Sequence, residues 1–299
     1  MEEILLELKI SNELISLYKG NIPIIDEYSM YKFYLNEDKS SSFPHPPFII
    51  PFMYSYDADH YHIGIVKHWF NDRPLTFGDM TDGSAFATTE IAKTEKQLFN
   101  RLLFNEFVNN EDCKVTDRLV QCKQLMGLHD LNFGDLEKIN SIHFDNAECY
   151  VDALIENPPL SCIADEERYK GDFPANESIV ISSNLANACY FEIFHKEWIG
   201  YNTEKKGFSL FRKESKYKPL ENIPEWLRPD VDKKELFENY MEKRDFGKAW
   251  LTINGPGFNP IEVGERLQRL KEFSNEKGFH LWVDFWCEKY GKKESFIFI

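Results

Sequence analysis

The sequence predicts an α+β protein in which mixed or antiparallel sheets are flanked by helices. Three observations predict this class. Apolar residues near the N-terminus recur at helical spacing, short aromatic-rich runs bounded by turn residues follow, and helical spacing then returns. A smaller β-α-β-β unit is expected at the C-terminal end.

The N-terminal part is expected to be a helix, a set of strands and further helices. Residues 2–19 have the apolar spacing of one amphipathic helix. Strands joined by Ser-, Pro- and Asn-rich turns are expected over 28–35, 48–54, 61–70 and 75–80. A helix should begin near Thr88, although Thr94-Glu95-Lys96-Gln97 matches a capping box at which it can restart. Residues 112–127 continue as helix.

A linker is expected over residues 213–229, because this charged stretch contains three evenly spaced prolines. Trp226 and Leu227 inside it indicate a linker that packs against the fold. The linker separates an N-terminal α+β domain, residues 1–212, from a C-terminal unit, residues 230–299. Within the N-terminal domain, the middle third of the chain has weaker patterns, with helical pieces expected over 131–156 and strands over 177–199 and 207–212.

The C-terminal unit is expected to combine two helices with three strands. Helices are predicted over 232–243 and 260–277, and strands over 248–253, 279–287 and 294–299. Pro260 suits the first turn of the second helix, and Gly278 suits its C-cap. These elements complete the β-α-β-β unit.

The composition excludes several classes of partner. The net charge is −15, from 35 basic and 50 acidic residues, and such a surface repels nucleic acid. No apolar run approaches the roughly 20 residues of a membrane span, and the N-terminus lacks the pattern of a signal peptide. Six scattered cysteines without a C-x-x-C pair fit reduced thiols. We therefore expect a cytoplasmic protein that binds neither nucleic acid nor membrane.

Residues 57–69 are the most informative stretch, with two carboxylates, three imidazoles and two large aromatic rings. On a strand, alternation places His60, His62 and His68 on one face. Two histidines at i and i+2 chelate one metal ion when a carboxylate from elsewhere completes the site. Two other interpretations stay open. The stretch can be a strand whose imidazoles are hydrogen-bonded to neighbours, or it can form a surface that binds a partner.

No catalytic residue is assigned, and no cofactor is expected. The chain has no G-x-S-x-G elbow and no cysteine with a nearby histidine in a catalytic pattern. Tryptophan and tyrosine are enriched at binding hot spots, and several of them lie on expected strands beside charged residues. The candidate partner-binding residues are Asp57, Asp59, Trp69 and Trp198.

Residues 1–110 carry motifs of a known family. Its opening segment, Leu-Pro-x-x-Tyr-x-x-Phe-Leu, is similar to Ile22-Pro23, Asp26-Glu27-Tyr28, Tyr31, Phe33 and Leu35. Its strands and closing helix are similar to Ile50-Pro51-Phe52, Gly64, Trp69, Phe99, Leu103 and Phe107. On these residues the segment resembles the SUKH superfamily, whose members are often bacterial immunity proteins. The sequence departs from the family by two extra residues between Pro23 and Tyr28 and by the missing Asn-Gly-Gly turn after Leu35.

The resemblance implies a non-enzymatic bacterial immunity or inhibitor protein that neutralises a toxin by stoichiometric binding. An acidic, aromatic-bearing sheet face would cover a basic toxin domain. Asp57 and Asp59 would steer the encounter, and Trp69 would supply buried contact. The alternative function is that of a metal-dependent hydrolase that uses His60 and His62, with His68 or Asp59.

Overall fold

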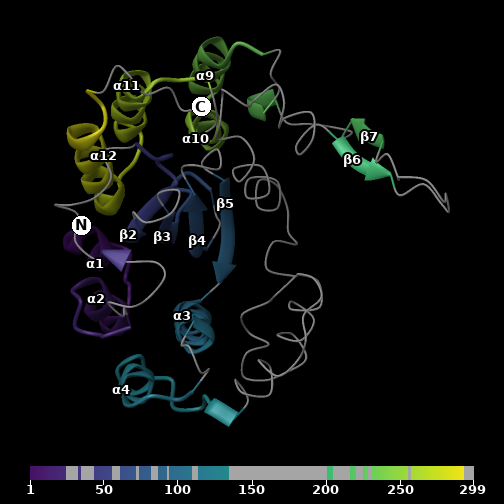
Figure 1. The fold of residues 1–299 in the computed structure, drawn as a ribbon. Coiled ribbons are helices and arrows are strands. Elements are labelled where there is room, and N and C mark those ends of the chain that lie inside the picture. Colours follow the sequence, from purple (N-terminus) through teal and green to yellow (C-terminus); the bar gives the residue numbers. More distant parts are fainter. Residues whose placement is uncertain are drawn as a thin grey trace.

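The computed structural model describes residues 1–24, 33–34, 44–55, 61–71, 74–81, 87–92, 94–109, 114–134, 201–204, 216–219, 225–227, 231–254 and 257–292. The helices within these ranges are α1 (Glu2–Glu7), α2 (Asn12–Tyr18), α3 (Glu95–Asn109), α4 (Asp117–Leu125), the 3₁₀ helix η6 (Glu225–Leu227), α9 (Lys233–Glu242), α10 (Phe246–Ile253), α11 (Pro260–Lys271) and α12 (Lys277–Lys289). The strands are β1 (Phe33–Tyr34), β2 (Ile49–Ser55), β3 (Tyr61–Val66), β4 (Thr76–Thr81), β5 (Ala87–Ala92), β6 (Tyr201–Glu204) and β7 (Lys216–Pro219). Figure 1 shows their arrangement.

Strands β1 to β5 form one antiparallel sheet in which every strand pairs with its neighbours in sequence. The predicted strands are confirmed at the positions of β1 to β4. The pairs Ile50↔Ile65 and Ile65↔Phe77 place these three side chains on one face of the sheet, because directly opposed residues share a face. His62, Gly64 and Val66 alternate with them and lie on the other face.

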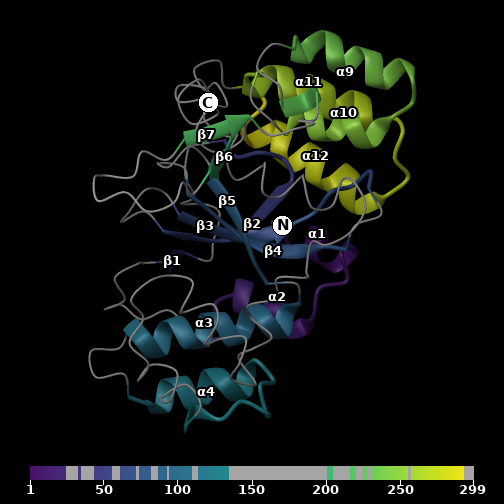
Figure 2. The same ribbon diagram turned by 90° about the vertical axis from the view of Figure 1, so that its right-hand side faces the viewer.

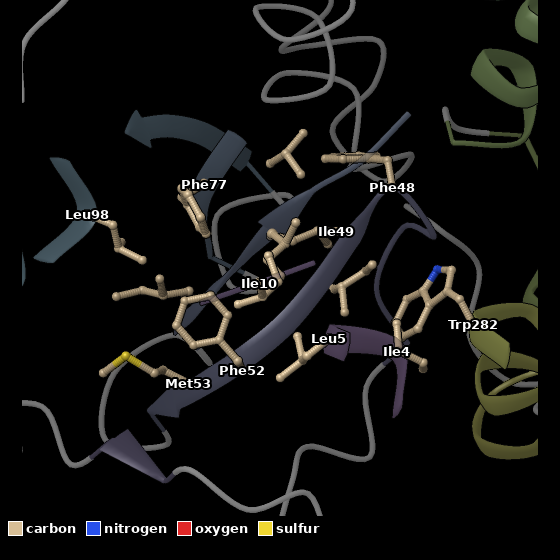
Figure 3. Packing of buried hydrophobic residues seen from close by; sticks show 14 of the residues in the cluster. Ile4, Leu5, Ile10, Phe48, Ile49, Phe52, Met53, Phe77, Leu98 and Trp282 are labelled. Atoms are coloured by element: carbon tan, nitrogen blue, oxygen red, sulfur yellow. The ribbon is translucent and has the colours of Figure 1, made fainter. Parts of the chain in front are cut away.

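The sheet lies between two groups of helices. Figures 1 and 2 both show α3 and α4 on one side of it and α9 to α12 on the other. In Figure 3, Phe52, Met53, Phe77 and Leu98 lie toward one side of the view, and Ile4 of α1 and Trp282 of α12 lie toward the other, where the two helices contact each other. Every residue of β3 from His62 to Val66 is buried, as expected of a central strand that is covered on both faces.

The helix that was expected from Thr88 begins seven residues later. Residues 87–92 form β5 instead, and α3 starts at the capping box. Thr94 N–H donates to Gln97 Oε1, and Gln97 N–H donates to Thr94 Oγ1, each over 3.2 Å. These two reciprocal hydrogen bonds mark in the sequence where β5 has ended and α3 begins.

The single N-terminal helix that was expected is two helices. Lys9 adopts a positive φ of 58°, which ends α1, and the Ser11 hydroxyl then caps α2 by accepting from Leu14 N–H. Ser11 also bonds to Glu95 through its backbone N–H, at 3.1 Å, and through its hydroxyl. These contacts attach the start of α2 to the start of α3.

The C-terminal unit is helical, so the predicted β-α-β-β arrangement is wrong within residues 231–292. The strands expected over 248–253 and 279–287 are the helices α10 and α12. Helix α10 is short, and its buried run Ala249–Ile253 has the composition of a strand. In α12, Phe279, Trp282, Val283 and Trp286 are buried at helical spacing. The strand predicted over 294–299 lies outside the described residues.

The expected start of the second C-terminal helix is confirmed, and its expected end is wrong. Pro260 occupies its first turn, behind a capping box between Asn259 and Glu262. The helix ends at Lys271, however, and Gly278 lies inside α12. A Cβ on Gly278 would lie 3.2 Å from Glu7 Cβ and 3.3 Å from Trp69 Cη2, so this glycine permits close packing.

The structure describes two short parts of the expected linker, which are β7 and η6. Trp226 is buried, and Glu225 is held by Lys233 Nζ, 2.9 Å from its carbonyl, and by the Tyr240 hydroxyl. These contacts confirm that this part of the linker packs down. The middle-third elements over 135–200 and the strand over 207–212 lie outside the described residues, and the domain boundaries stay predictions.

Candidate functional site: a histidine–tryptophan seam

The predicted site residues fall into two groups. Asp57, Asp59, His60 and Trp198 lie outside the described residues. The other three, His62, His68 and Trp69, are buried, with exposed fractions of 1%, 2% and 5%. The Trp69 indole contacts the ring of Phe279 in α12, with 5.4 Å between centroids. This position corrects the expectation that Trp69 presents its ring to a partner, because the ring packs within the fold.

His62 and His68 make different contacts. The His62 ring lies 6.4 Å from that of His45, a residue that the sequence interpretation left out. The His68 ring stacks on Phe48 at 5.7 Å and accepts a hydrogen bond from Trp250. Within the described ranges, no group of three or more His, Cys, Asp or Glu side chains could hold a metal ion. Because His60 is not among these residues, the metal site stays a prediction.

The structure instead joins the sheet to the C-terminal helices through a layer of buried rings. We call this layer the histidine–tryptophan seam. It consists of His45, His62, His68, Trp69, Trp250, Trp282, Trp286 and Tyr290.

The segment Pro44-His45-Pro46-Pro47 makes the first connection between the sheet and the C-terminal helices. Proline fixes its own φ and restricts the preceding residue, so this run has little conformational freedom. Its carbonyl groups serve as acceptors for α12. Trp286 Nε1 donates to the His45 carbonyl at 3.0 Å, and Trp282 Nε1 donates to the Pro47 carbonyl at 2.7 Å. Helix α12 is thereby fixed to the entry of β2.

The His45 ring contacts two aromatic rings of the C-terminal part. It stacks on Trp282, with 5.8 Å between centroids, and meets Tyr290 edge-on at 5.1 Å. Nδ1 lies 3.2 Å from the Pro46 carbonyl and donates to it, which leaves Nε2 as the unprotonated nitrogen. Nε2 is buried and has no hydrogen-bond partner among the described atoms.

Burial lowers the pKa of His45 well below its ordinary value. The neighbouring His62 lowers this pKa further, and Lys289 adds a smaller repulsion. The hydrogen bond to the Pro46 carbonyl acts in the opposite direction, since it favours the protonated ring. The ring is therefore neutral in the folded protein at neutral pH.

Helix α10 makes the second connection between the sheet and the C-terminal helices. Trp250, which is fully buried, donates from Nε1 to His68 Nδ1 at 3.2 Å. Asn254 at the end of α10 accepts from Phe48 N–H through Oδ1 and donates from Nδ2 to the Trp250 carbonyl, both at 2.7 Å. The imidazole of His68 thus has a structural role in joining the sheet to α10.

The charge of the protein is distributed unevenly along the chain. Residues 231–292 contain eleven acidic and eleven basic side chains, and Lys293 and Glu294 cancel each other. The whole net charge of −15 therefore belongs to residues 1–230. Several C-terminal charges are also paired, as in the two-pronged contact of Arg269 with Glu238, at 2.5 and 2.7 Å.

The sequence contained signals for part of the seam. A histidine between prolines, and tryptophans four residues apart at positions 282 and 286, are visible in the chain. Their meeting across more than 230 residues is a tertiary contact that no local pattern encodes.

Among the described residues, no helix is both long and apolar enough to cross a membrane. Comparison of the chain with protein-family models, curated proteins and solved structures gave no match.

Proposed function

We propose that this protein acts without a reactive centre, by binding another protein, and that it is a bacterial immunity or inhibitor protein of the cytoplasm. The partner would be a basic toxin domain, bound in a stoichiometric complex. The observation that carries the proposal is the division of charge, which assigns the whole acidic excess to residues 1–230.

An acidic excess that belongs to one part of the chain gives the surface formed by that part a negative field. Such a field speeds the approach of a basic protein and orients it toward the acidic part of the surface. A charge-balanced unit such as residues 231–292 exerts little attraction of this kind. Steering of this sort weakens as salt shortens the Debye length, to about 8 Å at physiological ionic strength.

The contacts of the buried histidines also support a non-enzymatic role. His68 accepts from Trp250, and His45 stacks between Trp282 and Tyr290, so both rings are engaged in packing the fold. General acid–base catalysis needs an imidazole within reach of a substrate. Both rings are almost completely buried, at 1% and 2% exposure.

The test is a search for a one-to-one complex with the proteins encoded beside this gene. Each is co-expressed with this protein, and the mass of the product is measured by light scattering. We expect a complex with a basic protein whose association rate falls as salt is raised. A protein that forms no such complex, or that contains a stoichiometric metal which is lost on His60→Ala substitution, would favour the hydrolase instead.

The steering role has its own pair of variants. Replacing Asp57 and Asp59 with Asn should slow association several-fold at low salt and have little effect at high salt. The matched control removes two exposed carboxylates from the balanced unit, by Glu265→Gln and Glu272→Gln. If both double variants slow association equally, the acidic excess of residues 1–230 does not direct the partner.

A further inference from the structure

We propose that the contact between residues 44–48 and α12 is a pH-sensitive latch, which releases the C-terminal helices from the sheet when the His45 ring takes up a proton. Two hydrogen bonds close this latch, from Trp286 to the His45 carbonyl and from Trp282 to the Pro47 carbonyl. The ring that would be protonated belongs to one of the two acceptor residues, His45, and it stacks on one of the two donors, Trp282.

A proton on this ring has no favourable place in the closed latch. The neutral ring donates from Nδ1 to the Pro46 carbonyl, so the proton must be added at Nε2. Nε2 is buried, and no described atom accepts a hydrogen bond from it. A buried charge with an unpaired N–H group is costly, so protonation favours a state in which the ring meets water.

Among the described residues, the charged and titratable neighbours that act on the ring, His62 and Lys289, oppose its charge. From β3 the neighbour is His62, from α12 it is Lys289, and the phenol ring of Tyr290 follows directly after α12. Lys289 adds positive charge, and its Nζ lies 5.5 Å from the centre of the Tyr290 ring. The Trp282 face can attract a cation, but this partial gain leaves the Nε2 proton without an acceptor.

The direction of the pH effect follows from the lowered pKa of His45 in the closed state. In the released state the ring is in water and recovers an ordinary pKa near 6.5. The closed state is fully favoured above that pH. As pH falls below it, the released state binds the proton first, and the equilibrium constant for release rises by up to about tenfold per pH unit.

Release should be local to the C-terminal helices. Both acceptor carbonyls belong to the segment that carries the ring, and both donors belong to α12. Helix α3 lies on the opposite side of the sheet and packs against β5 and α4 (Figure 2). Acidification should therefore expose Trp282 and Trp286 before it affects α3.

Hydrogen exchange measured by mass spectrometry tests the latch on the full chain. Between about pH 7.5 and about pH 5.5, and after correction for the intrinsic exchange rate, α12 peptides should lose roughly tenfold in protection while α3 peptides keep theirs. His45→Gln should abolish this difference, since the amide does not titrate. The matched control is His280→Gln on α12, a partly exposed histidine whose Nε2 contacts the Ser274 carbonyl at 2.7 Å, and it should behave like the native protein.

Three results overturn the proposal. In the first, the pH-dependent loss of α12 protection persists in His45→Gln. In the second, His280→Gln removes that loss, and in the third, α3 loses protection together with α12. If His45→Gln does not fold, NMR of the ring carbons in the native protein decides. The His45 signals should report protonation only in the released state, and a ring that is protonated while α12 stays protected contradicts the latch.

Discussion

At the scale of single residues, Gly64 determines how closely β2 and β3 approach. A Cβ built on Gly64 would lie 2.6 Å from the Ile50 carbonyl oxygen and 2.8 Å from Pro51 Cα. Both are backbone atoms of the paired strand, which cannot move aside as a flexible side chain can. The close approach of the β2 backbone therefore explains why a glycine occupies this position inside a central strand.

Gly64→Ala should accordingly destabilise the protein, by about 1–3 kcal/mol, as overpacking of a core does. The measurement is the free energy of unfolding from urea titration. Gly134→Ala is the control, because its Cβ would meet nothing closer than Asn132 Oδ1 at 3.4 Å. Equal stability of the two variants would show that the strands can separate to admit a methyl group.

Cys122 is the residue whose chemical reactivity the structure predicts most clearly. Its side chain has no exposed surface, and burial raises its pKa to about 11, with Arg118 opposing and Glu106 adding to the rise. Because only the thiolate is alkylated, iodoacetamide at about pH 8 should modify Cys122 at least about a hundredfold more slowly than in the unfolded chain. Peptide mapping measures this rate. Alkylation of Cys122 at the unfolded rate would contradict its burial.

At the scale of elements, periodicity predicted more than composition did. The helix α9 and the start of α11 follow from apolar spacing and capping residues, and both are confirmed. Helix α12 was mistaken for a strand because its phenylalanines and tryptophans are strand-forming types, although Phe279, Trp282, Val283 and Trp286 have helical spacing. The buried run Ala249–Ile253 of α10 spans little more than one helical turn, so its spacing did not distinguish it from a buried strand.

The site residues were predicted less well, for a reason at the same scale. Alternation correctly placed His62 on one face of β3, but this face is covered by the C-terminal helices. Which face of a sheet is covered depends on where distant helices pack. The sequence therefore suggested an exposed or metal-binding face, where the structure has buried rings.

The capping box of α11 gives a prediction about that element. Asn259 accepts from Glu262 N–H at 2.9 Å, and Glu262 accepts from Asn259 N–H at 3.1 Å. Asn259→Ala should reduce the free energy of unfolding by about 1 kcal/mol. Asn239→Ala, at an exposed position inside α9, should change it little or raise it by a few tenths of a kcal/mol. Thermal and urea unfolding compare the two, and an equal effect would show that the cap is unimportant.

At the scale of the whole molecule, the C-terminal helices complete the core of the N-terminal part. Trp250, Trp282 and Trp286 have no exposed surface, and each donates its indole N–H to an acceptor between residues 45 and 68. The sheet face that bears His62 and Val66 is buried by the same helices. One hydrophobic cluster runs through both parts.

A chain that ends at residue 230 should therefore fail to form a stable monomer. Without α9 to α12, the carbonyl groups of His45 and Pro47 lose their indole partners, and the apolar side chains of one sheet face meet water. We expect this fragment to aggregate or to bind a hydrophobic dye, and to recover a cooperative unfolding transition when residues 231–299 are supplied as a second chain. The fragment 1–230 carries the whole net charge of −15, so poor solubility could not be attributed to a lack of charge. A soluble, cooperatively folded fragment 1–230 would show instead that the seam joins two independent units, and the acidic part could then bind its partner without the C-terminal helices.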